Sequence, residues 1–139
     1  MLKNVNKQHI ALVSIQDKNS SNSISEMKNN IPRKFLVAEI KFEDNSKIKI
    51  LRIAKNSNDD TFHRNIFNAM FSEFKKINAL VIPLYGGKIL RDDTNNLICV
   101  GGSSISFPTN PNWAEVFRII SNDLPESYSN YQIKYLDII

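Results

Sequence analysis

An amphipathic pattern between Phe62 and Ile77 constrains the fold more than any other part of this sequence. Large apolar residues recur there at three- and four-residue spacings, while polar residues occupy much of the other side. This period is that of an α-helix with one apolar face, which another layer must cover. The pattern therefore predicts a helix packed on a sheet, with Asp60 or Thr61 able to cap its start. The apolar set is Phe62, Ile66, Phe67, Met70, Phe71, Phe74 and Ile77.

Strand-like segments flank this helix on both sides, and a second amphipathic segment starts at Trp113 and ends near Asp123. The order strand, two strands, helix, two strands, helix, strand favours layers of helix and sheet. We expect an α/β fold: a single-domain sandwich over residues 1–139, with a mixed six-stranded β-sheet and two α-helices. Residues 88–90 can continue the fourth strand past a bend at Gly86-Gly87. The expected strands are 9–15, 34–42, 47–54, 79–85, 97–103 and 131–135.

The segment from Asp17 to Asn30 differs in composition from its surroundings. It is rich in Asn, Ser and Lys and has few residues that could join a core. Such a composition predicts a long exposed loop, and its position indicates a flexible insertion.

Cysteine content and hydropathy bear on the compartment. The single cysteine, Cys99, cannot form an internal disulfide, and its apolar neighbours predict a buried strand thiol. No apolar run approaches the length of a membrane helix. We therefore expect a cytoplasmic monomer with no membrane association.

The charge balance is basic. The chain has 18 Lys and Arg residues against 14 Asp and Glu, a formal net charge of +4. A basic chain suits an anionic partner, but this excess is too small to choose between a phosphoryl group and a nucleic acid. We expect no nucleic-acid partner, because nothing beyond this charge points to one.

One of the two histidines, His63, falls in the first turn of the predicted helix. The helix dipole disfavours a positive charge there, so the imidazole should stay neutral and be available as a base or nucleophile. The free N–H groups of the same turn attract anions such as phosphate. The alternative is an ordinary exposed histidine at the start of a helix.

Glycines and cations at strand ends are the next candidates. Gly86-Gly87 and Gly101-Gly102 could let backbone amides form an anion-binding concavity, or could be turns and bulges. Positive residues lie in strands at Lys34, Arg52 and Lys88. Arg52 interrupts an apolar run, so it must reach solvent, a bound anion or a structural carboxylate.

Several familiar catalytic patterns are missing from the sequence. It has no His/Cys cluster at zinc spacing, no Gly-x-Ser-x-Gly motif, and no phosphate loop around Cys99. Asp92-Asp93 is typical of a hairpin turn rather than of a metal site. We therefore expect no metal and no cofactor.

The candidate segments, in this order, resemble the phosphohistidine phosphatase (Janus/Ocnus) family. The resemblance is collinear from Arg33 to Asp137, and the predicted strand 9–15 corresponds to the family's first strand. Six motifs carry it: Lys34-Phe35-Leu36-Val37, Ile50-Leu51-Arg52, Phe62-His63-Arg64-Asn65-Ile66-Phe67, Gly86-Gly87-Lys88-Ile89, Gly101-Gly102-Ser103 and Tyr128-Ser129-Asn130-Tyr131-Gln132-Ile133.

The resemblance implies a metal-independent protein phosphatase that hydrolyses phosphoramidate bonds in phosphohistidine-containing proteins. In it, His63 would be the general base or the nucleophile. The phosphate-binding groups would be the side chains of Lys34, Arg52 and Lys88 and the backbone amides around Ser103, Ser104 and Ile105.

This sequence departs from the family pattern at three positions near the implied site. Lys88 stands where arginine is usual, Phe107 where glycine is expected, and Gly102 where an aromatic residue is expected. Lysine keeps the charge but loses bidentate phosphate geometry. These departures bear on substrate preference and leave an alternative open, a catalytically weak family member that binds phosphorylated proteins.

Overall fold

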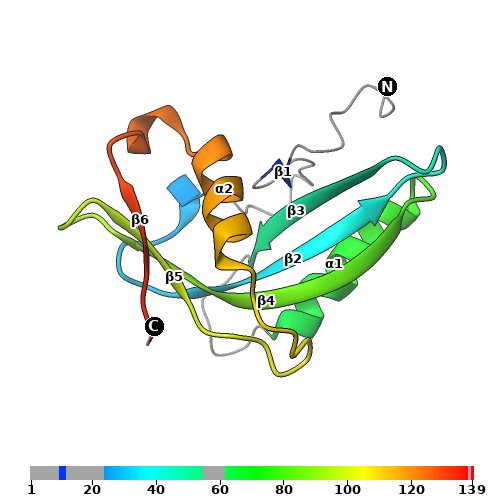
Figure 1. Cartoon of the computed structure of the whole chain (residues 1–139), viewed down its shortest axis with the longest axis horizontal. Helices are drawn as coiled ribbons and strands as arrows, with labels where there is room; N and C mark the ends of the chain where they lie inside the picture. The colour runs from blue at the N-terminus through cyan, green and yellow to red at the C-terminus, as the bar shows by residue number, and fades with distance from the viewer. Residues whose placement is uncertain (1–9, 12–23, 55–61, 138) are drawn as a thin grey trace.

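The computed structural model describes residues 10–11, 24–54, 62–137 and 139, with only the backbone described for 10–11. In these residues the strands form one sheet, and the two α-helices cover its opposite faces (Figure 1). The strands are β1 (Ile10–Ala11), β2 (Arg33–Lys41), β3 (Lys47–Ile53), β4 (Leu80–Asp92), β5 (Leu97–Gly101) and β6 (Gln132–Tyr135). The helices are α1 (His63–Lys75) and α2 (Trp113–Asp123), with short 3-10 turns η2 (Ile24–Glu26) and η4 (Glu126–Tyr128).

The sheet has the strand order β1-β3-β2-β4-β5-β6. Strand β2 is antiparallel to β3 and β4, β4 is antiparallel to β5, and β1 and β6 run parallel to β3 and β5. The predicted mixed α/β fold with two helices is confirmed. Strands β2 to β6 make up the body of the sheet, while β1 is a two-residue pairing at the edge of β3. The rest of the predicted strand 9–15 lies outside the described residues.

The two sheet faces carry separate cores. On one face, Leu36 and Ile40 of β2 pack with Ile66, Met70 and Phe74 of α1, as the helical periodicity predicts. On the other, alternate residues of the same strands pack against α2. The β2, β3 and α2 members of that second core are Phe35, Val37, Leu51, Ile53, Val116, Ile119 and Ile120.

Strand β4 runs through Gly86-Gly87 to Asp92, so residues 88–90 continue the strand as predicted, and the predicted end at Tyr85 is too early. Its pairing with β2 shifts between Val37 and Ala38, which leaves Leu84 as an extra residue in a β-bulge. A bulge reverses the side-chain alternation of the residues that follow it. Lys88 consequently pairs with Lys34 and lies on the α1 face.

Part of the segment predicted to be an exposed loop belongs to the core. Ile24 is 0% exposed and Met27 3% exposed, and both pack in the core on the α2 face. The turn η2 places these two residues close together, so a pair of apolar side chains suffices to anchor the segment. The prediction of exposure is therefore wrong for Ile24 and Met27, whereas Ser25, Glu26 and residues 28–30 are exposed; residues 17–23 lie outside the described part.

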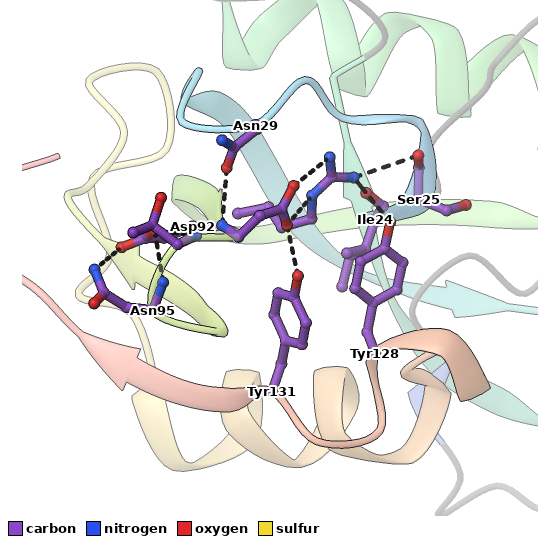
Figure 2. A network of polar contacts seen from close by, with 10 residues as sticks. Ile24, Ser25, Asn29, Asp92, Asn95, Tyr128 and Tyr131 are labelled. Carbon is purple, nitrogen blue, oxygen red and sulfur yellow. Dashed lines mark hydrogen bonds and ion pairs between the residues drawn. The ribbon is translucent and has the colours of Figure 1, made fainter.

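The guanidinium of Arg91 ties this segment to the rest of the fold; of its partners, Figure 2 labels Ile24, Ser25 and Tyr128. It pairs with both oxygens of Asp93 and donates to the backbone oxygens of Ile24 and Ser25. The hydroxyl of Tyr128 lies 3.1 Å from Arg91 Nη1. A buried arginine is stable only with such partners, so Arg91 joins η2, the end of β4 and η4.

Candidate functional site

Helix α1 begins at His63, directly after Phe62. The side chain of Asn65 reaches back and accepts a hydrogen bond from the backbone N–H of Phe62 at 2.8 Å. This contact satisfies one of the donors that a helix start leaves unpaired. The predicted caps, Asp60 and Thr61, lie outside the described residues.

The imidazole of His63 is packed against strand β4. The side chain is 5% exposed, and Nε2 lies 3.0 Å from the carbonyl oxygen of Gly87. A Cβ atom on Gly86 would lie 2.5 Å from Cδ2 of the ring, so only glycine permits this approach. The alternative of an ordinary exposed histidine does not fit this geometry.

This environment favours the neutral form of His63. Burial lowers its pKa, the Gly87 carbonyl acts in the opposite direction, and the charges of Lys34 and Lys88 lower it further. A neutral ring that donates from Nε2 carries no proton on Nδ1. Within the described residues Nδ1 has no hydrogen-bond partner, and it lies on the ring edge opposite Cδ2 and Nε2.

A pocket of about 410 Å³ opens beside this ring. Lys34 and Lys88 both line it and face each other directly across the β2–β4 pair. Like charges in that register repel, and an anion bound between them would remove the repulsion. Lys88 Nζ also lies 3.4 Å from the backbone oxygen of Ile139. The lining residues are Lys34, Phe62, His63, Lys88, Gly102, Ser103, Ile105 and Ser106.

The loop after β5 supplies one side of the pocket. Gly102 has φ +75°, a conformation that favours glycine, and Ser103 and Ile105 line the pocket. Their backbone amides form no hydrogen bond within the described part of the chain. Ser104 instead is buried, and its Oγ accepts from the N–H of Phe107 at 3.1 Å. The loop thus offers amide donors beside the lysines.

Arg52 does not line this pocket. Its guanidinium makes a bidentate ion pair with Glu73 of α1, at 2.8 and 3.2 Å, and the side chain is 4% exposed. The structure therefore shows Arg52 paired with a structural carboxylate, which was the alternative for this residue; its predicted contact with phosphate stays a prediction. Glu73 falls on the polar side of the helical pattern, and periodicity alone could not identify it as the partner.

Phe62 is a lining residue that the sequence pattern assigned to the apolar helix face. It precedes the helix and is 61% exposed, with Lys34 Nζ 5.7 Å from the centre of its ring. Its position directly before His63 could have indicated that Phe62 does not belong to the apolar face, because a residue that precedes the helix does not follow the helical period.

The described residues contain no group of three or more His, Cys, Asp or Glu side chains that could hold a metal ion. Cys99 is buried in β5, as predicted, and burial raises the pKa of its thiol. No helix in the described residues is long and apolar enough to cross a membrane.

The chain was compared with known proteins. The model of the Janus/Ocnus family (Ocnus) matches residues 22–132, a range that contains both α-helices and every lining residue of the pocket. No curated protein matches the chain. Because the family match spans most of the 139 residues, this chain belongs to the Janus/Ocnus family.

Proposed function

We propose that this protein is a metal-independent protein phosphohistidine phosphatase, with His63 as general base or nucleophile. One observation carries the proposal. A buried imidazole whose Nε2 lies 3.0 Å from the Gly87 carbonyl stands in the same pocket as two lysines that face each other in register. This combination provides an unprotonated nitrogen next to a site for phosphoryl oxygens.

The pocket has groups suited to each part of the reaction. As a base, His63 Nδ1 takes a proton from water while the water oxygen bonds to phosphorus and the P–N bond breaks. Lys34, Lys88 and the amides of Ser103 and Ile105 stabilise the negative oxygens. The products are inorganic phosphate and the dephosphorylated side chain. In the nucleophilic route, Nδ1 itself bonds to phosphorus as the P–N bond of the substrate breaks, and water later hydrolyses the phosphorylated His63 to inorganic phosphate and the free imidazole.

Metal independence follows from the leaving group. The imidazole of a phosphohistidine can be protonated on its other nitrogen before it departs, so it leaves as a neutral ring. A metal ion is not needed to stabilise a neutral leaving group. The pocket then has to position the substrate and hold the phosphoryl oxygens.

The test is hydrolysis of a phosphohistidine peptide, with phosphoramidate as a second substrate. His63→Ala should lower kcat/KM at least about a hundredfold, the usual contribution of a general base. His9→Ala is the matched control, since His9 is the other histidine of the chain. The rate of hydrolysis of each substrate should be the same with and without excess EDTA. Undiminished hydrolysis by His63→Ala would refute the proposal, and activity that needs an added metal would refute the metal-independent mechanism.

A second candidate is a family member that binds phosphorylated proteins with little or no turnover. The ion pair of Arg52 with Glu73 favours it, because Lys34 and Lys88 are then the cationic side chains among the lining residues. Lysine lacks the bidentate geometry that arginine offers a phosphoryl group. Tight binding of a phosphopeptide that the wild-type protein does not hydrolyse would support this candidate over the first.

A further inference from the structure

Two exposed apolar side chains, Phe62 and Ile105, line a pocket whose other lining residues are Lys, His, Ser and Gly. Ile105 is 99% exposed and Phe62 is 61% exposed. Single exposed apolar residues are common on protein surfaces. Here, however, two of them from different elements border the same cationic pocket. We refer to Phe62 and Ile105 as the apolar rim.

The loop holds Ile105 in solvent while anchoring its neighbours. Ser104, on one side, is 3% exposed and its Oγ accepts from the N–H of Phe107. Phe107, on the other side, packs on Phe67 of α1 with ring centroids 5.8 Å apart. The loop therefore places one apolar residue on the core and directs another outward. Because its neighbours are anchored, binding of a partner at Ile105 requires little ordering of the loop backbone.

Phe62 is also held in place. Its backbone N–H donates to Asn65, and its ring lies within cation–π distance of Lys34. The ring thus stands between the cationic interior of the pocket and solvent. A ligand that placed a phosphoryl group at Lys34 would bring its adjoining atoms next to Phe62.

We infer that the apolar rim binds an apolar side chain adjacent to the phosphorylated residue of a polypeptide. The inference rests on the proposed function, because it takes the phosphoryl group to be part of a protein. Inorganic phosphate could use the lysines and loop amides but would leave the rim exposed. A leucine or similar residue beside the phosphoresidue would cover it. The rim therefore makes flanking sequence a determinant of affinity, beyond the phosphoryl group itself.

The experiment measures binding rather than turnover. Two peptides carry the same non-hydrolysable phosphonate analogue of phosphohistidine, flanked on both sides by Leu in one and by Ser in the other. Partial burial of the rim should make the wild-type protein bind the Leu peptide about tenfold more tightly. In Ile105→Ser this ratio of Kd values should fall close to one, and Phe62→Ser should lower it too. Comparing two peptides within one variant cancels any general loss of affinity.

Leu80→Ser is the matched control, because Leu80 is 53% exposed and is not a lining residue. It lies at the end of β4 that pairs with Lys41, far along β2 from Lys34, and should keep the tenfold ratio. A wild-type ratio near one, or an unchanged ratio in Ile105→Ser, would overturn the inference. So would self-association of the wild-type protein that Ile105→Ser abolishes, since a second copy would then occupy the rim.

The two proposals fail in different ways. If the protein discriminates between the peptides but hydrolyses no phosphohistidine, the rim inference stands and the phosphatase proposal fails. If the protein hydrolyses the phosphohistidine versions of both peptides with equal kcat/KM, and binds both phosphonate analogues equally, the phosphatase proposal stands and the rim inference fails. Absence of binding to either phosphonate peptide would overturn the rim inference, while the hydrolysis assay decides the phosphatase proposal independently.

Discussion

The imidazole of His63 is positioned by backbone groups of β4 rather than by another side chain. The carbonyl of Gly87 accepts from Nε2, and the missing Cβ of Gly86 leaves space for the ring. Because the peptide chain of a paired strand is rigid, the ring has a fixed tautomer and orientation. Two adjacent glycines therefore do the work that a carboxylate does for histidine in many other sites.

Replacing Gly86 by alanine should displace His63. The new Cβ would lie 2.5 Å from Cδ2, 2.8 Å from Nε2 and 3.0 Å from the Phe35 carbonyl, so the ring has to move. We expect kcat/KM for phosphoramidate to fall at least about tenfold if the ring shifts by roughly an ångström. The Nε2–H signal in the NMR spectrum should change as well. Full activity with an unchanged His63 spectrum would contradict this role of Gly86.

Activity should persist below the ordinary histidine pKa of about 6.5. Burial and the charges of Lys34 and Lys88 lower the pKa of His63, and its neutral form is the base in the proposed mechanism. The acid limb of kcat/KM against pH should therefore lie below 6.5, and Lys34→Met should move it upward. An acid limb at or above 6.5 in the wild-type protein would show that His63 is not held neutral as the structure indicates.

The same shift has a consequence for folding stability. The unfolded chain takes up a proton at His63 more readily than the native chain, because the native pKa is the lower of the two. The neutral, buried His63 therefore makes its full contribution to stability above about pH 6.5, and this contribution is lost as the pH falls through the native pKa. NMR titration of His63, with His9→Gln to simplify assignment, measures that pKa directly.

At the scale of the elements, the bulge at Leu84 decides which side chains meet. Simple alternation from Val81, which packs on α1, would have placed Lys88 on the α2 face. The bulge brings Lys88 to the face of Lys34 and His63 instead.

Periodicity predicted the strands and helices because their apolar residues repeat, but no local pattern marks an inserted residue within a strand. Charge partners such as Glu73 were unpredictable for a related reason, since they depend on how α1 is docked.

The ion pair between β3 and α1 should be important for stability. Glu73→Leu would leave the buried Arg52 guanidinium without its carboxylate, which we expect to cost about 3 kcal/mol of unfolding free energy. The double variant Arg52→Met, Glu73→Leu should recover much of this loss, because it buries no unpaired charge. Urea unfolding of the three proteins gives both values. A large rise in KM for a stable double variant would show that Arg52 reaches the substrate after all.

At the scale of the whole molecule, the candidate site and the contacts that hold α2 lie on opposite faces of the sheet. The α1 face and the loop after β5 carry the candidate site, while on the α2 face the buried carboxylate of Glu115 accepts hydrogen bonds from Tyr85 and from the half-buried Lys49. Burial raises the pKa of Tyr85, which donates to the carboxylate. These groups tie α2 to the sheet. They lie on the face opposite His63 and do not line the pocket, whose polar groups are the lysines, His63 and the loop amides.

Inorganic phosphate should stabilise the whole fold if the pocket binds it. A ligand that binds only the native state at a hundred times its Kd adds about 2.7 kcal/mol to the unfolding free energy. The rise in Tm with phosphate, measured against chloride at equal ionic strength, should be lost in Lys34→Ala and in Lys88→Ala. Lys76→Ala is the matched control, because Lys76 is exposed, is not a lining residue, and its removal lowers the net charge of +4 by the same amount. An equal loss in all three variants would mean that phosphate acts on net charge alone, whereas a loss confined to the two pocket lysines would locate the anion between β2 and β4.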